Sequence, residues 1–297
     1  MGFLGLMNRG RNRLRWWRWQ LSRRWLKEIT ISSRQGRFAI ATDAEDPISR
    51  SLFFYGHFEL DLVTPTLAHL RELGLIPSAG HGTVIDVGAN IGVISIGMLN
   101  CGEFARAIAI EPDPRNFALL ARNVRQNRIA ELMMCLPVAV SDHQGTVEFE
   151  LSADNFGDHR VRTASPRTFA ANAFGENARR VIPVPARKLD DLVTELPSDW
   201  TQDLALIWMD VQGHEGNVLR GARRILSTGV PVVAEFWPYG IARSGMSRDE
   251  FLDLTNQVFS SYWALRNGRF ERHPIAALDR LFDELPGPND FENLIFN

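Results

Sequence analysis

The sequence is poor in cysteine and in long apolar runs. Cys101 and Cys135 are its only cysteines, and both stand in apolar stretches. Two such residues do not make a disulfide framework, so we expect a protein of the reducing cytoplasm. No run approaches the roughly 20 apolar residues of a transmembrane helix, and the first residues lack the apolar core of a signal peptide. These absences argue against a secreted disulfide-rich domain and against a membrane-spanning protein.

Acidic residues are scarce at the start of the chain, although the whole chain is nearly balanced at a net charge of −2. Residues 1–37 contain ten Arg or Lys and one acid, Glu28, which leaves a net charge of −11 on the remainder. At 297 residues the chain is one large or two modest domains, long enough for a substantial core. The basic segment therefore precedes a distinctly acidic globular part.

Residues 9–27 combine arginines with four of the eight tryptophans. On a helical wheel one stripe collects Leu14, Trp17, Leu21, Trp25 and Ile29, although Arg18 falls into it. One hypothesis is an interfacial helix that places tryptophans at headgroup depth and arginines on anionic lipid, at the inner membrane face. The alternatives are a basic leader, or a helix packed on the catalytic domain. Nucleic acid is a further polyanion that arginine and aromatic residues suit, and it ranks behind both.

The most informative stretch is residues 83–111. A β-branched run ends in Asp86 and opens into a turn from Gly88 to Gly92, and a small-residue helix follows. A second strand, residues 105–110, ends at Glu111, about 20 positions after the glycines, where a ribose-binding carboxylate stands in nucleotide-binding folds. This is the strand, turn, helix and strand order of a βαβ unit.

The spacing of the glycines indicates which ligand the turn takes. A dinucleotide fingerprint needs G-x-G-x-x-G before a helix that faces a pyrophosphate. Here an acid, Asp86, precedes the first glycine and no third glycine is in register. A carboxylate there suits a cationic ligand better, and the turn resembles motif I of class I S-adenosylmethionine (SAM) methyltransferases. The alternative is a glycine turn in another doubly wound protein.

A second concentrated signal lies in residues 204–236. An apolar run delivers Asp210 at its end, and a glycine turn presents His214 and Glu215 at the start of a predicted helix, residues 217–226. Residues 230–236 read as a buried strand that contains Glu235. Ligands of open α/β sheets bind outside the carboxyl ends of the strands, so we expect these residues to face the same crevice as Asp86.

The remaining segments predict the surroundings of that crevice. Residues 38–82 read as a strand and a helix (60–73) that cover one side of it, with His57 and Glu59 either facing it or at the surface. After sheet sequence at 132–140, Ser141 and Asp142 either meet an adenine ring or form a polar turn.

Residues 152–180 are polar, rich in arginine and without clear periodicity, and they predict a mobile lid or an acceptor-binding loop that contains Asn155. Prolines in residues 181–185 predict an edge strand, because proline cannot donate to a central ladder.

Taken together, these motifs resemble the FkbM-type SAM-dependent methyltransferases. The resemblance rests on residues 84–92, 110–112, 138–142 and 209–215, followed by 218–222. It covers roughly residues 53–240 and the closing strand 293–296, and it leaves out the arginine- and tryptophan-rich segment. Trp208 stands where the family usually has lysine, and Gln212 where it commonly has glutamate.

The resemblance implies an α/β fold: a Rossmann-like, doubly wound, mostly parallel seven-stranded sheet of the class I SAM methyltransferases. We expect three parts: a basic segment at 1–37, a strand-and-helix module at 38–82 packed on the core, and a SAM-binding domain at 83–297 with a lid-like insertion at 152–180.

The implied activity is O-methylation of a hydroxyl with SAM as cofactor, on a sugar of a glycan or glycolipid. The alternatives are another acceptor (a polyketide, RNA or protein) or a non-catalytic SAM-fold binding protein. The predicted cofactor-binding residues are Asp86, Gly88, Ala89, Asn90, Gly92, Glu111, Ser141 and Asp142. For the acceptor we name Asn155 and Glu235.

Methyl transfer to a sugar hydroxyl needs a base, because the hydroxyl is a weak nucleophile. The candidates are Asp210, at a strand end, and His214, whose ordinary pKa lies near neutrality. Glu215 is a further catalytic candidate, or it stabilises the helix start. Asp210, Glu235 and His214 could also hold a divalent cation, but no ligand spacing is diagnostic and we assign no metal.

Overall fold

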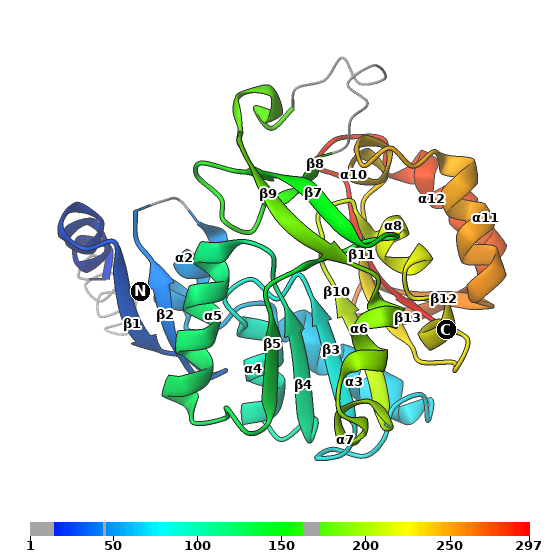
Figure 1. The fold of residues 1–297 in the computed structure, drawn as a ribbon, viewed down its shortest axis with the longest axis horizontal. Helices are drawn as coiled ribbons and strands as arrows, with labels where there is room; N and C mark the ends of the chain where they lie inside the picture. Colours follow the sequence, from blue (N-terminus) through cyan, green and yellow to red (C-terminus); the bar gives the residue numbers. More distant parts are fainter. Residues whose placement is uncertain (1–14, 44–45, 163–172) are drawn as a thin grey trace, which may run out of the picture.

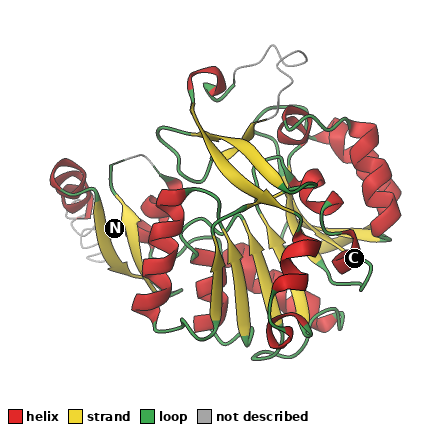
Figure 2. Cartoon of the chain, viewed as in Figure 1, coloured by secondary structure: helices red, strands yellow, loops and turns green. Residues whose placement is uncertain are grey.

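The computed structural model describes residues 15–43, 46–162 and 173–297. An eight-stranded sheet forms the centre, in the order β13-β12-β14-β11-β10-β3-β4-β5, with helices on both faces (Figures 1 and 2). The parallel strands are β3 (Thr83–Val87), β4 (Arg106–Ile110), β5 (Met133–Leu136), β10 (Leu204–Met209) and β11 (Val232–Phe236). The antiparallel part consists of β14 (Glu292–Phe296), β12 (Ser261–Arg266) and β13 (Arg269–Pro274).

The α/β doubly wound fold is thus confirmed, with one strand more than the seven predicted. The hairpin that joins β12 to β13 turns through Asn267 and Gly268, which both have positive φ angles, 51° and 74°. An Asn-Gly pair of this kind is the preferred two-residue hairpin turn. The sequence therefore contained a signal for the extra strand.

The parallel strands are apolar almost throughout because helices cover both of their faces. On one face Val84 and Ala107 pack with Leu67 and Ile96, from α3 (Leu60–Glu72) and α4 (Val93–Asn100). On the other face Ile85 packs in the core that includes α6 (Leu189–Glu195), α8 (Glu215–Arg220), α11 (Arg248–Val258) and α12 (Leu278–Glu284). The remaining helices are α2 (Pro47–Tyr55), α5 (Pro114–Asn127), α7 (Ser198–Thr201), α9 (Arg223–Leu226) and α10 (Pro238–Arg243), with 3₁₀ turns η1 (Glu176–Ala178) and η2 (Ile275–Ala277).

The strand order reverses between β3 and β10. From β3 the chain proceeds to β4 and β5 on one side, and later it returns to β10 and β11 on the other. The carboxyl ends of β3, β4 and β10 therefore meet beside a topological switch point, where open α/β sheets bind their ligands.

A second, four-stranded sheet lies beyond those carboxyl ends (Figure 1), in the order β6-β9-β7-β8. Its strands are β6 (Ala139–Val140), β7 (Gly145–Leu151), β8 (Arg160–Arg162) and β9 (Arg180–Arg187). The edge position predicted for residues 181–185 is confirmed, although β9 as a whole lies between β6 and β7. Its prolines are tolerated because β6 pairs only with Ala186 and Arg187, so Pro183 and Pro185 face a neighbouring strand on one side alone. Part of the predicted lid, residues 163–172, lies outside the described residues.

The predicted helix at residues 217–226 is two helices, α8 and α9. The backbone N–H of Asp190 donates to the carbonyl of Gly221 (3.0 Å), which breaks the ladder. The Asp190 carboxylate then accepts from the backbone N–H groups of Arg224 and Ile225, at 2.8 and 3.0 Å. A side chain from α6 therefore starts a new helix, which is a contact that local sequence does not reveal.

The basic segment is partly structured and packs on the rest of the molecule. Residues 15–25 form a helix, and β1 (Glu28–Ser32) pairs with β2 (Arg37–Ala41) in a two-stranded sheet. The predicted stripe through Ile29 is wrong at that end, because Ile29 lies in β1, and Leu14 lies outside the described residues. Across the described residues, no helix combines the length and the apolarity that crossing a membrane requires.

Candidate functional site

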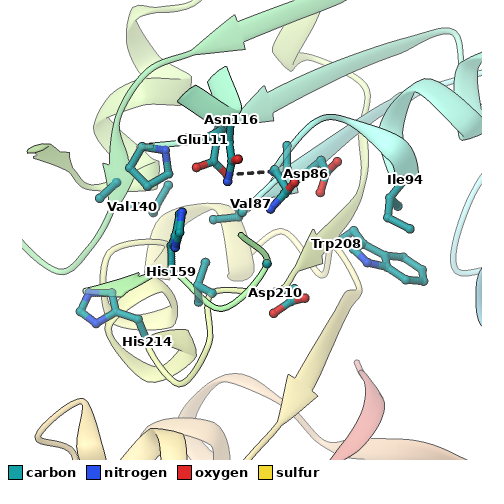
Figure 3. A pocket seen from close by; sticks show the side chains of 18 of the residues that line it. Asp86, Val87, Ile94, Glu111, Asn116, Val140, His159, Trp208, Asp210 and His214 are labelled. Atoms are coloured by element: carbon teal, nitrogen blue, oxygen red, sulfur yellow. Dashed lines mark hydrogen bonds between the residues drawn. The ribbon is translucent and has the colours of Figure 1, made fainter. Parts of the chain in front are cut away.

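A cavity opens at the carboxyl ends of β3, β4 and β10 (Figure 3). It encloses about 900 Å³ of space between atoms, with open solvent at its mouth included. Its acidic lining residues are Glu59, Asp86, Glu111 and Asp210. Ile48 and Phe58 line it from α2 and the segment after it, and Phe149, Phe156 and Val161 line it from the second sheet and its loops.

The glycine turn brings two strand ends into contact. Gly88 has a φ of 86°, and a Cβ built on it would lie 1.9 Å from the carbonyl oxygen of Asp210. Gly92 has a φ of 84° and begins α4. The cavity is lined by the turn residues Gly88, Ala89 and Asn90. Gly92 does not line it and lies instead against Leu120 and Ile96. Only glycine fits at residue 88 without separating β3 from β10.

Glu111 is held by the backbone. Its Oε2 accepts from the N–H of Asn90 and its Oε1 from the N–H of Asp113, both at 2.8 Å. Each carboxylate oxygen has a further lone pair, and the side chain lines the cavity. Burial raises the pKa of Glu111 from 4.5 to about 8. The carboxylate is therefore fixed in direction and is sensitive to any hydrogen-bond donor or positive charge that enters the cavity.

Asp86 lies below the turn and is 3% exposed. Its Oδ2 accepts from the N–H of Ser95, at 3.3 Å, near the start of α4. Burial raises the pKa of Asp86 to about 6, partly offset by the hydrogen bonds to Ser95. The carboxylate thus compensates the positive end of α4 while lining the cavity.

Asp210 follows β10 and is exposed to the cavity, although protein surrounds it on its other sides. The Nε2 of Gln212 donates to its Oδ1 at 2.7 Å. Gln212 adopts a left-handed conformation, with a φ of 54°, which is costly for a residue other than glycine. Burial raises the pKa of Asp210, and the hydrogen bond from Gln212 lowers it in part. A strained residue thus orients a reachable carboxylate.

Glu59 and Glu235 are two further acids close enough to Asp210 to interact with it electrostatically. Glu59 lines the cavity, with a φ of 52° at the start of α3, and burial together with Asp210 raises its pKa to about 8. His57, the other residue expected here, is not among the lining residues. Burial, with Asp210 and Glu215, raises the pKa of Glu235. Glu235, predicted to bind the acceptor, does not line the cavity.

His214 lines the cavity and has both ring nitrogens occupied. The Nδ2 amide of Asn217 lies 3.1 Å from Nδ1, and the Oγ of Ser141 lies 3.0 Å from Nε2. If Asn217 donates, as its NH₂ group must, Nδ1 is the acceptor and Nε2–H donates to Ser141. Burial lowers the pKa of His214 to about 4, so the ring is neutral. This arrangement suits a structural histidine better than a general base.

Glu215 forms a hydrogen bond within the turn that leads from β10 to α8. It is 1% exposed, and its Oε1 accepts from the N–H of Val211 at 3.1 Å. Burial raises its pKa to about 7. Glu215 does not line the cavity, which favours the alternative role of stabilising the start of α8.

Other predicted contacts lie outside the lining. Ser141 is 1% exposed and bonds to His214, and Asp142 bonds to His143 at the surface. The neighbouring cavity wall is formed instead by residues 138–140. Asn155 accepts from the N–H of Gly157 at 3.0 Å and shapes the loop, whereas Phe156 reaches the cavity.

Sequence reasoning missed His159 and Trp208 as cavity residues. The Nδ1 of His159 accepts from the N–H of Ser152 at 3.0 Å, which leaves the proton on Nε2. Burial lowers the pKa of His159 to about 4, so it offers a neutral donor. Trp208, where the family usually has lysine, is 4% exposed and forms part of the wall. A single histidine in an irregular loop gives no signal from which its position could be predicted.

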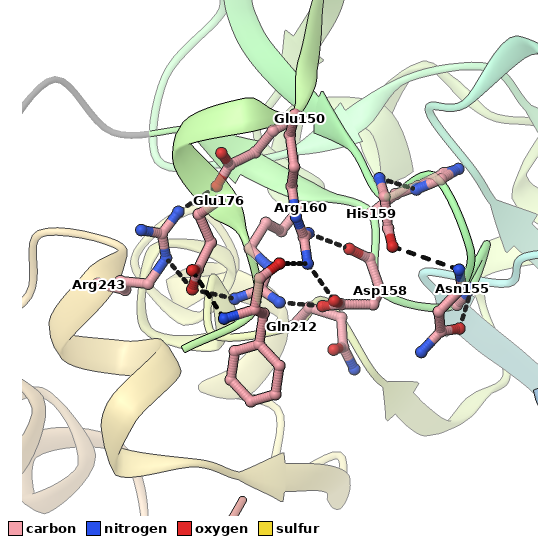
Figure 4. A network of polar contacts seen from close by, with 12 residues as sticks. Glu150, Asn155, Asp158, His159, Arg160, Glu176, Gln212 and Arg243 are labelled. Atoms are coloured by element: carbon pink, nitrogen blue, oxygen red, sulfur yellow. Dashed lines mark hydrogen bonds and ion pairs between the residues drawn. The ribbon is translucent and has the colours of Figure 1, made fainter. Parts of the chain in front are cut away.

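A network of ion pairs holds this loop in place (Figure 4). Asp158 pairs with Arg160 and Arg179, and Glu176 pairs with Arg243. The Tyr239 hydroxyl donates to Glu176 at 2.9 Å, which ties the network to α10. The wall that carries Phe156 and His159 is therefore fastened to the main domain.

Metal binding finds no support in the part of the chain that the structure describes. No group of three or more histidine, cysteine, aspartate or glutamate side chains there is arranged to hold an ion. Asp210, Glu235 and His214, the set considered from the sequence, do not form such a group.

Comparison with known proteins identifies the family. The family model described as the methyltransferase FkbM domain matches residues 86–261, more than half of the chain. A similar protein is the 2-O-methyltransferase NoeI of Sinorhizobium fredii, 27% identical over 196 residues, which are 64% of this chain and 78% of NoeI. The methyltransferase sdnD of Sordaria araneosa is 26% identical over 52% of this chain and 64% of its own length.

Among solved structures, the methyltransferase FkbM of Methylobacillus flagellatus aligns over 75% of this chain and 45% of its own, with 21% identity and a TM-score of 0.43. The family match spans both the glycine turn after β3 and the Asp210 turn after β10. The chain therefore belongs to the FkbM methyltransferase family and is a methyltransferase.

Proposed function

We propose that this chain is a SAM-dependent O-methyltransferase that acts on a hydroxyl of a sugar in a glycan or glycolipid. The observation that carries the proposal is the acid-lined cavity at the switch point. There Glu111 follows β4 and Asp210 follows β10, and the glycine turn after β3 lies at the same cavity.

The cavity chemistry fits SAM, which carries an ammonium group, a sulfonium and a nucleoside. The four lining carboxylates match the two cationic groups, and there is no lysine or arginine among the described lining residues. The same potential would oppose the diphosphate of a dinucleotide. Ile110 and residues 138–140 add apolar surface near Glu111 for an adenine ring. When bound, SAM would supply a methyl group activated by the sulfonium.

Each cavity residue then has a role that its contacts support. Glu111 would accept from the ribose hydroxyls with the lone pairs that its backbone bonds leave over. Asp86 and residues 88–90 would surround the amino acid part. Fixing two reactants in near-attack geometry contributes about 7–11 kcal/mol to catalysis, and the contact between Gly88 and Asp210 fixes the two halves of this site.

Asp210 is the base in this proposal. Its Oδ1 is oriented by Gln212, and the carboxylate faces the cavity. Burial raises the pKa of Asp210, which makes its carboxylate a better proton acceptor than that of an ordinary aspartate. The acceptor hydroxyl would transfer its proton to Asp210 as its oxygen bonds to the methyl carbon, while the bond from that carbon to sulfur would break and S-adenosylhomocysteine would leave. His214 has both nitrogens bonded, and we give it the task of positioning the turn.

A neutral, hydroxyl-rich acceptor suits this cavity. Glu59 and Asp210 can each accept from a hydroxyl, and the described lining, without lysine or arginine, offers no cationic partner to the phosphates of an acceptor such as RNA. A 2-O-methyltransferase among the similar proteins is consistent with a hydroxyl acceptor.

The test is methyl transfer from labelled SAM to separate lipid, polysaccharide and RNA fractions, with Asp210→Asn as the inactive control. Label in the lipid or polysaccharide fraction that requires Asp210 supports the proposal. Label confined to the RNA fraction would refute the proposed class of acceptor. A folded protein that binds SAM and labels nothing would favour the non-catalytic alternative.

A further inference from the structure

The helix of residues 15–25, which we call the N-terminal helix, is fixed to the body of the protein through the side that carries Trp19. Trp19 is 1% exposed and packs on Phe53 and Phe54 of α2, with ring centroids 5.0 and 5.8 Å away. The guanidinium of Arg15 donates to the carbonyl of Phe54 at 2.8 Å. At the other end of the helix, the N–H of Thr42 donates to the carbonyl of Lys27 at 2.9 Å.

These anchors decide which face points outward. Successive residues of a helix are about 100° apart, so Trp17 and Leu21 lie nearly opposite Trp19. Their side chains are both 56% exposed, and Trp25, one turn further, is 73% exposed. The three form an apolar ridge at spacings of four residues on the outside of the molecule. Exposed tryptophans are uncommon on a soluble surface, and adjacent ones mark an interaction site.

Positive charge borders the ridge on both sides. Arg24 lies on one flank, with its guanidinium over the ring of Trp25 at 5.5 Å, and Arg18 lies on the other. Trp17, Gln20, Leu21, Arg23 and Arg24 enclose a shallow hollow on the helix surface. Residues 15–27 contain no acid. An apolar centre with cationic borders matches the boundary between acyl chains and anionic headgroups.

We propose that the N-terminal helix docks this protein on an anionic lipid bilayer, with Trp17, Leu21 and Trp25 at headgroup depth and Arg18 and Arg24 on the headgroups. Nucleic acid is less well matched, because the arginines border the ridge rather than form a groove along which a backbone could run. The helix is attached to α2, and Ile48 of the same α2 lines the cavity, as do Phe58 and Glu59 just after it. Docking does not depend on the proposed acceptor.

The experiment uses the full chain in co-sedimentation with vesicles of phosphatidylcholine, with and without phosphatidylserine. We expect binding only to the mixed vesicles, weakened by salt because charged headgroups contribute. The triple variant Trp17→Ser, Leu21→Ser, Trp25→Ser retains Trp19 and should bind about tenfold more weakly or worse. Arg18→Gln with Arg24→Gln should lower binding to anionic vesicles by a similar factor.

A matched control removes exposed apolar side chains elsewhere: Leu132→Ser with Phe291→Ser, at residues that are 43% and 51% exposed. This control should bind as the unaltered chain does, and far-UV circular dichroism checks that every variant is folded. Failure of the unaltered chain to sediment with anionic vesicles overturns the proposal, as does a triple variant that binds equally well. Size-exclusion chromatography and RNA gel shifts complete the test. If the triple variant loses self-association or RNA binding without any vesicle binding, the ridge has another partner and the proposal is wrong.

Discussion

Replacing Glu111 with glutamine is the sharpest test of the proposed cofactor site. Glutamine keeps the size of the side chain and one acceptor oxygen, so it can still accept from Asn90 or Asp113. Alanine would leave both backbone N–H groups without their partner, and each buried, unpaired donor costs about 1–3 kcal/mol. Glu111→Gln therefore removes the charge while disturbing the turn least.

The expected loss of SAM affinity follows from the hydrogen bonds to ribose. A hydrogen bond to a charged group contributes about 1.5–3 kcal/mol, against about 0.5–1.5 kcal/mol for a neutral one. Two such bonds weakened by removal of the charge correspond to a loss of about 2–3 kcal/mol, or a Kd about 30- to 150-fold higher. Because the pKa of Glu111 is raised to about 8, the charged form gains population as the pH rises through that value.

Isothermal titration calorimetry on both sides of pH 8 measures this difference. Affinity of the unaltered chain should rise with pH through that region, whereas Glu111→Gln should lack that rise and fall further behind at higher pH. The exposed Glu131, changed to glutamine, controls for a general loss of negative charge. An unchanged Kd in folded Glu111→Gln would remove this residue from the site. An equal loss in Glu131→Gln would show that the effect is not local.

Three further predictions concern the rest of the cavity. Asp210→Asn should lower methyl transfer by about two to four orders of magnitude with little change in SAM Kd, whereas His214→Ala should mainly lower the unfolding free energy, by about 1–3 kcal/mol. Initial rates and urea unfolding separate the two, and the reverse pattern would make His214 the base. Gln212→Gly relieves a left-handed residue and should raise the unfolding free energy by up to about 1 kcal/mol while lowering kcat; a kcat equal to that of the unaltered chain would contradict the positioning role. Burial raises the pKa of Glu59 and Glu111 to about 8, above their ordinary 4.5, so the folded chain binds more protons than the unfolded chain between those values. The unfolding free energy of the ligand-free protein, measured by calorimetry, should therefore fall as pH rises from about 5 to 8, and a rise would refute the burial of these acids.

The sequence was sufficient for the parts of the fold that local patterns determine. Apolar runs that end in Asp86, Glu111 and Asp210 predicted three parallel strands, and the structure brings these acids to one cavity. This worked because parallel strands are buried on both faces and their carboxyl ends share one edge of the sheet.

Sequence reasoning is insufficient where a distant residue decides the local structure. Asp190 of α6 starts α9 and divides the predicted helix at residues 217–226. The role of His214 depends on Ser141, 73 residues earlier in the chain. Such contacts leave no periodic trace in the sequence.

The van der Waals contact between the glycine turn and Asp210 has a consequence for how acceptors of different size are accommodated. With no side chain at residue 88, the β3 turn rests directly on the carbonyl of Asp210, and neither can shift without the other. In the proposed function, the SAM-binding half of the site and its base would therefore behave as one rigid unit. Room for a bulkier acceptor would then have to come from the facing wall, where Phe156 and His159 lie on a loop that ion pairs with Arg160 and Arg179 hold in place. Changes in acceptor preference among related enzymes should therefore accumulate in the loop that carries Phe156 and His159. The contact between Gly88 and Asp210 should stay the same.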